Sequence, residues 1–269
     1  MTGLNPNIAL ECNNLTIGYV HKKKPQIIQQ NIRLQIQKGQ FVAILGQNGI
    51  GKSTLLRTMT KMQEPLAGSV FIEGRNLRSW NFTTLSNKIS VVLTERLPES
   101  QLSVYELVAL GRQPYTNWVG NLSEKDHQRI RASLEQTETF EFAQKYFYEL
   151  SDGQLQRVMI ARALAQDTDI IFLDEPTAHL DMHHTIKVFQ VLKRLVKEHN
   201  KTIVLSTHEV NLAMKIADHF ILLSEKQITS GTLDTLVSRK VFDQLFPSEI
   251  LNFDPILEQF VVTKNNLSS

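Results

Sequence analysis

The stretch of the chain with the clearest chemistry is GQNGIGKST, Gly46–Thr54. The apolar run Phe41–Leu45 precedes it and two leucines follow it, so it is expected to join a strand to a helix. Glycines let such a turn adopt conformations that side chains forbid, and its N–H groups can then face phosphates. Lys52 can reach the β- and γ-phosphates of a nucleotide, and the Ser53 hydroxyl can ligate Mg²⁺. The full match to G-x-x-x-x-G-K-[ST] predicts a nucleoside triphosphate site.

Two adjacent acids, Asp174 and Glu175, follow the apolar run Ile170–Leu173. Ligands of open α/β sheets bind at the carboxyl ends of such strands. An aspartate there can hold the Mg²⁺ shell, and the next glutamate can orient or deprotonate an attacking water. The alternative is a strand that ends in solvated acids before a turn at Pro176. The upstream phosphate loop favours the catalytic interpretation.

A third segment, LSDGQ at Leu150–Gln154, is expected to open a helix. Ser151 is a good N-cap residue, and the N-terminus of a helix favours an anion. An ordinary helix cap remains the alternative interpretation of this segment by itself.

The elements that must position these residues alternate between strands and helices. Expected strands are Ile8–Cys12, Leu15–Tyr19, Ile27–Ile36, Gln40–Leu45, Val70–Ile72, Ile89–Leu93, Ile170–Leu173, Thr202–Leu205 and Phe220–Leu223. Expected helices are Gly51–Met62, Met182–His199 and Glu209–Ile216. From about 94 to 150 the pattern is helical, with helix starts at Ser103 and Ser123. The pattern therefore predicts an α/β protein with an inserted helical block.

Composition narrows the class of protein. The chain has 269 residues and a formal net charge of +2, so it lacks the strongly basic balance of a nucleic-acid binder. The single Cys12 excludes an internal disulfide and is expected to be a small core residue. No signal peptide is visible, and no apolar run approaches the length of about 20 residues that spans a bilayer. We expect a soluble chain, so that in transport another chain must supply the membrane path.

The ordered motifs resemble the nucleotide-binding subunit of ABC transporters over about residues 8–254. LSDGQ resembles the LSGGQ signature of that family, and Asp174 with Glu175 resembles its Walker B pair. Ala178–Asp181 matches the family's D-loop, and His208 after an apolar strand matches its switch histidine. Tyr19 stands where the family has an aromatic ring that stacks on adenine.

The resemblance implies a fold and a site. The fold is a RecA-like P-loop NTPase core with an N-terminal antiparallel β subdomain and a helical insert at about 94–152, followed by a tail at 255–269. Implied catalytic residues are Glu175, His208 and Lys52. ATP contacts are implied for Tyr19, Gly46, Gln47, Asn48, Gly49, Ile50, Gly51, Lys52, Ser53, Thr54, Ser151, Gly153, Gln154 and Asp181. Mg²⁺ contacts are implied for Ser53, Asp174 and Thr94.

The same resemblance implies the assembly. Two subunits would form a head-to-tail homodimer that holds two ATP molecules between one phosphate loop and the other signature. The dimer would drive integral membrane permease subunits at the cytoplasmic face of the inner (cell) membrane. A periplasmic or surface binding protein would take part indirectly, and no nucleic acid would.

Several segments narrow the resemblance to ATPases of importers for iron-siderophore, haem and vitamin B12. They are Ser103–Tyr115, Gly120 with Leu122–Ser123, Asp174–Asp181 and His208–Ala213. Two alternatives stay open: a soluble ABC ATPase without a transport role, and a degenerate regulatory ATP-binding subunit.

Three positions call for separate expectations. Thr94 aligns with a glutamine that contacts Mg²⁺ in the family, and Glu95 is an alternative oxygen ligand. Asp152 replaces the first glycine of the signature, and we expect it to point away from phosphate and to cap a backbone N–H. His183 and His184 are not expected to bind a metal together, because adjacent helix positions do not face one site.

Overall fold

The computed structural model describes residues 6–94, 100–116, 120–225, 227–244 and 251–262. The chain divides into two compact units, residues 1–79 with 204–269 and residues 80–203. The boundary falls within strand β8 (Thr202–Ser206). In the described part of the chain, no helix has the length and apolar character needed to cross a membrane.

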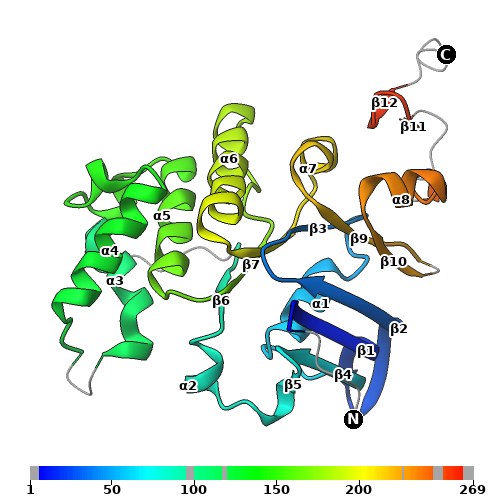
Figure 1. The fold of residues 1–269 in the computed structure, drawn as a ribbon, viewed down its shortest axis with the longest axis horizontal. Helices are drawn as coiled ribbons and strands as arrows, with labels where there is room; N and C mark the ends of the chain where they lie inside the picture. The colour runs from blue at the N-terminus through cyan, green and yellow to red at the C-terminus, as the bar shows by residue number, and fades with distance from the viewer. Residues whose placement is uncertain (1–5, 95–99, 117–119, 226, 245–250, 263–269) are drawn as a thin grey trace. The chain divides into compact units, whose positions relative to one another are not determined.

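The first unit contains an antiparallel sheet of order β2-β1-β4-β5, coloured blue to cyan in Figure 1. Its strands are β1 (Ile8–His21), β2 (Lys24–Gln37), β4 (Ala67–Ile72) and β5 (Arg75–Asn76). The sequence predicted two strands where β1 is continuous. At the predicted gap between those two strands, the pairing of β1 with β2 shifts register between Cys12 and Leu15, and Asn14 adopts a left-handed φ of 47°. Asparagine tolerates that conformation better than most residues, so the strand bulges instead of ending.

The first unit also holds the strand that leads into the phosphate loop. β3 (Phe41–Gly46) is buried along its whole length and pairs in parallel with β9 (His219–Leu223). β9 pairs antiparallel with β10 (Ile228–Gly231). Helices α1 (Lys52–Met59), α7 (Val210–Ile216) and α8 (Leu233–Ser238) belong to this unit, with short 3₁₀ turns at Leu77–Ser79 and Phe242–Gln244. The pattern of apolar residues on both faces of β3 is typical of a covered parallel strand.

A C-terminal hairpin joins β11 (Leu251–Asp254) to β12 (Gln259–Val262), and it includes residues on both sides of the predicted boundary at 254. The side chain of Asn211 on α7 anchors it. Its Nδ2 donates to the Phe260 carbonyl at 3.1 Å, and its Oδ1 accepts from the Phe260 N–H at 2.8 Å.

The second unit carries the helical block and one pair of buried strands. β6 (Ile89–Val92) pairs in parallel with β7 (Ile170–Asp174). Helices α2 (Phe82–Leu85), α3 (Val104–Ala109), α4 (Glu124–Gln136), α5 (Asp152–Ala165) and α6 (Met182–His199) complete it, with 3₁₀ turns at Leu110–Tyr115, Phe140–Phe142 and Phe147–Glu149. The predicted bounds of α6 are confirmed.

Helices α3, α4 and α5 pack on one another around a shared apolar core (Figure 1, green). Val108, Ile130, Leu134 and Val158 are fully buried in it. Each of the three helices begins with a reciprocal capping box, in which a serine caps the helix and the acid or amide three residues later caps the serine. The predicted helix starts at Ser103 and Ser123 are therefore confirmed.

Cys12 is buried with 1% of its surface exposed, which confirms it as a core residue. Burial raises the pKa of its thiol, so the sulfur stays protonated and unreactive.

Candidate active site

The phosphate loop has the strand–turn–helix geometry that its sequence predicts. Gly49 and Gly51 take left-handed φ angles of 77° and 110°. A Cβ at Gly51 would also lie 2.6 Å from the side chain of Ile28, so both conformation and space require glycine there. Gly51 is the N-cap of α1, and no side chain caps the helix. The first amides of α1 are therefore oriented as an anion-binding helix start.

Lys52 lies inside this loop with only 4% of its surface exposed. Its Nζ donates to the carbonyl oxygens of Gly46 at 3.0 Å and Gln47 at 3.2 Å. The same nitrogen lies 3.5 Å from Nε2 of His208. The structure thus brings two of the three predicted catalytic residues together within the first unit.

Tyr19 also reaches the loop. Its hydroxyl shares a 2.8 Å hydrogen bond with Oγ1 of Thr54, while 48% of the residue remains exposed. The bond fixes one edge of the ring beside the start of α1 and leaves ring surface accessible. That arrangement is compatible with stacking on a base.

In the second unit, β7 ends in the predicted acid pair. Asp174 is buried, with 5% exposed, and the next residue, Glu175, has a left-handed φ of 47°. Such a conformation is uncommon for glutamate and costs on the order of 1 kcal/mol, so surrounding structure must enforce it. Strained backbone of this kind clusters at functional sites. No sequence pattern predicted the left-handed conformation of Glu175.

Thr94 contacts the acid pair through the backbone. Its Oγ1 donates to the Asp174 carbonyl at 2.7 Å, so the hydroxyl hydrogen is used to hold the end of β7. Any contact of Thr94 with Mg²⁺ would have to use the lone pairs of that oxygen, and it stays a prediction. The alternative ligand Glu95 lies outside the described residues.

An open cavity of about 160 Å³ adjoins the acid pair. Its polar lining residues are Thr94, Asp152, Gln156, Glu175 and His179. The expected capping role of Asp152 is wrong in the described structure, because Ser151 and Gln154 form the cap of α5. Ser151 Oγ accepts from the Gln154 N–H at 3.3 Å, and the Ser151 N–H donates to Gln154 Oε1 at 3.0 Å.

Asp181 caps α6 at the end of the D-loop. Its Oδ1 accepts from the His184 N–H at 2.9 Å, and its Oδ2 lies 2.8 Å from the ring Nδ1 of the same residue. The backbone N–H and then the ring of His184 hold the pKa of the Asp181 carboxyl below its usual range. The carboxylate is therefore the ionised partner in this contact.

Asp181, His183 and His184 carry potential ligand atoms that all lie within 4.8 Å of one another. The expectation that the two histidines cannot face one place is therefore wrong, because both lie in the first turn of α6 beside Asp181. Both carboxylate oxygens already contact His184, and the positive end of α6 disfavours a cation. We interpret the cluster as a helix cap.

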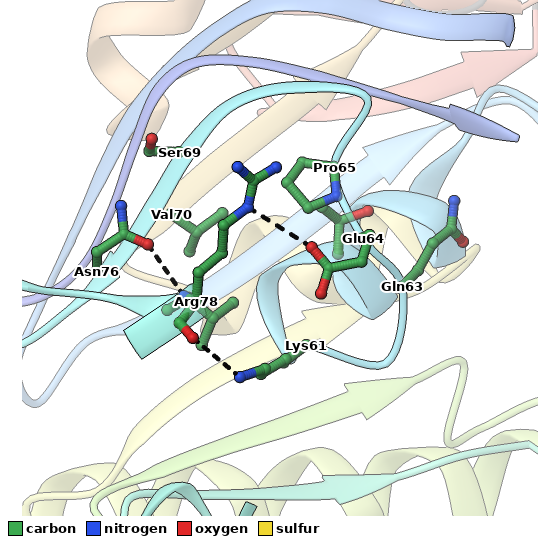
Figure 2. Close-up of a pocket in the computed structure, with 10 residues that line it drawn as sticks. Lys61, Gln63, Glu64, Pro65, Ser69, Val70, Asn76 and Arg78 are labelled. Atoms are coloured by element: carbon green, nitrogen blue, oxygen red, sulfur yellow. Dashed lines mark hydrogen bonds and ion pairs between the residues drawn. The ribbon is translucent and has the colours of Figure 1, made fainter. Parts of the chain in front are cut away.

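A separate small cavity of about 10 Å³ lies in the first unit beside β4. Figure 2 shows Arg78 among its lining residues: Arg78 Nε lies 3.6 Å from Glu64 Oε2, the Arg78 backbone N–H donates to Asn76 Oδ1 at 3.0 Å, and the Arg78 carbonyl accepts from Lys61 Nζ at 3.3 Å. A volume near that of one water probe cannot hold a nucleotide. It is not a competing active site.

The predicted site residues divide between the two units. Tyr19, Gly46–Thr54 and His208 belong to the first, and Thr94, Ser151–Gln154, Asp174, Glu175 and Asp181 belong to the second. A glycine-rich loop after one buried strand and an acid pair after another define a P-loop nucleoside-triphosphate-binding protein.

Comparison with known proteins identifies the family. Residues 29–178 match the family described as ABC transporter, which is more than half of the chain. The iron(3+)-hydroxamate import ATP-binding protein FhuC of Bacillus subtilis strain 168 is 34% identical over 239 residues, which are 88% of this chain and 87% of that protein. The chain belongs to the ABC transporter family and is one of its ATPase cassettes.

Solved structures agree in fold. A chain of a metal-chelate type ABC transporter in an inward-facing conformation aligns with a TM-score of 0.78 and 28% identity, covering 95% of this chain and 96% of that one. The dimeric structure of a bacterial ABC transporter cassette aligns with a TM-score of 0.72 and 31% identity, covering 83% of this chain and 98% of that one. The predicted P-loop core with an antiparallel β subdomain is therefore confirmed.

Proposed function

We propose that this cassette hydrolyses ATP to drive import of an iron chelate, such as a siderophore, haem or a cobalamin-like cargo, through a partner permease. The observation that carries the proposal is the buried Lys52 at the centre of the phosphate loop, beside His208. The names of the similar proteins, which refer to iron(3+)-hydroxamate import and a metal-chelate type transporter, favour this class of cargo. The cargo itself would contact other subunits.

Each residue has a defined task in the proposed reaction. Lys52 and the loop amides would stabilise charge on the transferred phosphoryl group. Glu175 would orient and polarise the attacking water, and His208 would contact the γ-phosphate. Tyr19, Thr54 and the remaining loop residues would hold the nucleotide.

The donor set fits Mg²⁺, which prefers hydroxyl and carboxylate oxygens. Ser53 and Asp174 would supply these oxygens, with Thr94 holding the Asp174 backbone in place. When bound, the ion would neutralise charge on the phosphate oxygens.

We further propose that the cassette works as a head-to-tail homodimer with two ATP molecules. Ser151 and Asp152 are exposed at the start of α5, where the capped helix end favours an anion. A signature in this position would complete the nucleotide site of a facing copy, together with Gly153, Gln154 and Asp181. A similar cassette has been solved as a dimer, which supports this arrangement.

Transport requires partners in the membrane. The dimer would associate peripherally with permease subunits at the cytoplasmic face of the cell membrane. A periplasmic or surface binding protein would deliver the chelate. The proposed nucleotide-binding domain covers 8–254, with its helical insert at about 94–152.

Uptake in cells tests the proposal. Deletion of the gene should abolish accumulation of radiolabelled iron given as a chelate, and the wild-type gene should restore it. The Lys52→Met gene should fail to restore it at equal protein abundance. The cassette should also co-purify with a permease encoded beside it.

Two other results would contradict the proposal in different ways. If cells that lack the gene take up the chelate normally, while the purified chain turns over ATP strongly, the chain is a soluble ABC ATPase without this transport role. ATP binding without turnover, even with the permease present, would indicate a regulatory subunit.

A further inference from the structure

The ring of His184 lies directly against Gly153 of the signature. A Cβ built on Gly153 would lie 2.4 Å from Cδ2, 2.5 Å from Cγ and 2.8 Å from Cβ of His184. Distances below 3.0 Å require something to move. The glycine is buried within α5, and its backbone is not in the left-handed region. Because alanine suits a helix better than glycine, the requirement for glycine here is one of space.

The ring cannot move away without a loss, because Asp181 holds it. The Asp181 carboxylate contacts both the backbone N–H and the ring Nδ1 of His184. An ionised carboxylate can only accept, so Nδ1 carries the hydrogen and the ring orientation is fixed. The side chain of His184 is 31% exposed, so it is largely enclosed by these neighbours.

Gly153 lies between the two residues that cap α5. Ser151 and Gln154 bond reciprocally across it, so a displacement of Gly153 would displace Ser151 as well. The D-loop acid, the histidine ring and the signature backbone therefore form one continuous set of contacts within the second unit. His183, the neighbouring histidine, is exposed; its ring meets the His184 ring edge-on, and its backbone N–H, which a side-chain substitution leaves in place, contacts Asp181.

We propose that His184 is a positioning residue, which transmits the placement of Asp181 in the D-loop to Gly153 and thereby sets Ser151 for the nucleotide of the facing subunit. The inference rests on the proposed dimeric ATPase. It assigns His184 no contact with ATP. The proposal predicts that the D-loop and the signature, which are both expected to contact a facing copy, move together.

The test is a double-mutant cycle on the full-length chain. Gly153→Ala should lower kcat/KM for ATP at least tenfold, because the new methyl group displaces the ring or the helix start. His184→Ala should lower it less, mainly through kcat. The double variant should recover to within threefold of His184→Ala, because the space for the methyl group is restored.

Two controls isolate the contact. His183→Ala should leave activity unchanged, and the Gly153→Ala/His183→Ala variant should be as impaired as Gly153→Ala. His184→Asn keeps a side-chain donor for Asp181 in a smaller group, so by itself it should retain more kcat than His184→Ala. The proposal is wrong if removal of His183 rescues Gly153→Ala as well as removal of His184 does, or if removal of His184 gives no rescue.

Thermal unfolding separates this inference from the proposed function. Gly153→Ala should lower the unfolding midpoint, and the added His184→Ala should raise it again, whether or not the chain hydrolyses ATP. If Gly153→Ala fails to fold, the double variant should fold. A double variant that also fails to fold would show that the ring is not what excludes the methyl group.

Discussion

The ammonium nitrogen of Lys52 lies 3.5 Å from Nε2 of His208, inside a loop whose carbonyls it also contacts. The two residues are 156 positions apart in sequence, but both belong to the first unit. That unit also contains the parallel pair of strands β3 and β9. A buried ammonium that contacts backbone carbonyls and an imidazole ring is strongly attractive to an anion. The contact therefore places the charge-binding and switch groups of the proposed mechanism together.

Replacement of that ammonium tests its role. Lys52→Met preserves the length of the side chain but removes the charge. We expect ATP affinity to fall about 100-fold, equivalent to about 2.7 kcal/mol. Stability should change by less than about 1 kcal/mol, because the loss of the hydrogen bonds to the Gly46 and Gln47 carbonyls is offset by the removal of a buried charge. Titration with a fluorescent ATP analogue and chemical unfolding measure the two effects, and a loss of affinity below threefold would contradict the assignment.

Glu175 is the proposed water-orienting residue, and its charge can be removed without changing its shape. Glu175→Gln should slow ATP hydrolysis by about 10²–10⁴-fold while ATP binding is retained. Glu198→Gln, a change of an exposed acid on α6, serves as the matched control and should behave as wild type. A Glu175→Gln enzyme that keeps half of wild-type turnover would exclude the proposed role.

The sequence predicted best the elements whose signals are local. Helix α6 combines a continuous apolar face with an Asp181 cap and a left-handed Asn200 at its end, so both bounds were correct. Helix α1 ends earlier than predicted, at Met59. The left-handed Lys61 is what stops the helix, since the Thr60 backbone N–H still donates to the Leu56 carbonyl.

Other features depend on contacts distant in sequence. The C-terminal hairpin is anchored by Asn211, which lies 49 positions from Phe260, and no local pattern indicates that pairing. The left-handed Glu175 and the contact between Gly153 and His184 likewise arise from tertiary packing. Motif spacing picked out the candidate site residues and predicted Ser151 as the N-cap of α5, but it could not show that Asp152 takes no part in that cap.

Thr94 offers a prediction about the departure from the family pattern. Thr94→Val keeps the shape and removes the donor to the Asp174 carbonyl, whereas Thr94→Ser keeps the donor. We expect Thr94→Val to lose about 1 kcal/mol of stability. It should also raise the Mg²⁺ concentration that gives half-maximal turnover, because the Asp174 backbone is less restrained. If Thr94→Ser has the same effect as Thr94→Val, the hydroxyl is not responsible.

A buried ion pair stabilises the helical block. Arg112 Nε donates to Asp126 Oδ1 at 2.8 Å, and both residues are at most 4% exposed. Arg112 also donates to the Ala165 carbonyl at 2.7 Å, and Ser123 donates to Asp126 Oδ2. Asp126→Asn should cost about 3 kcal/mol, because it leaves the guanidinium buried beside a neutral group. Asp126→Asn/Arg112→Met should be less destabilised than Asp126→Asn, since it removes the uncompensated charge.

The same pair predicts how stability depends on pH. Hydrogen bonds from Ser123, followed by the contact with Arg112, lower the pKa of Asp126 to about 2 from an ordinary value of 3.8. Because the folded-state pKa is the lower one, the carboxylate contributes its full stabilisation above about pH 4, and this contribution is lost as pH falls toward 2. Urea unfolding between pH 7 and pH 2 should therefore show a gap between wild type and Asp126→Asn that is constant above pH 4 and narrows below it. A gap that keeps its full size down to pH 2 would mean that Asp126 ionisation does not stabilise the fold.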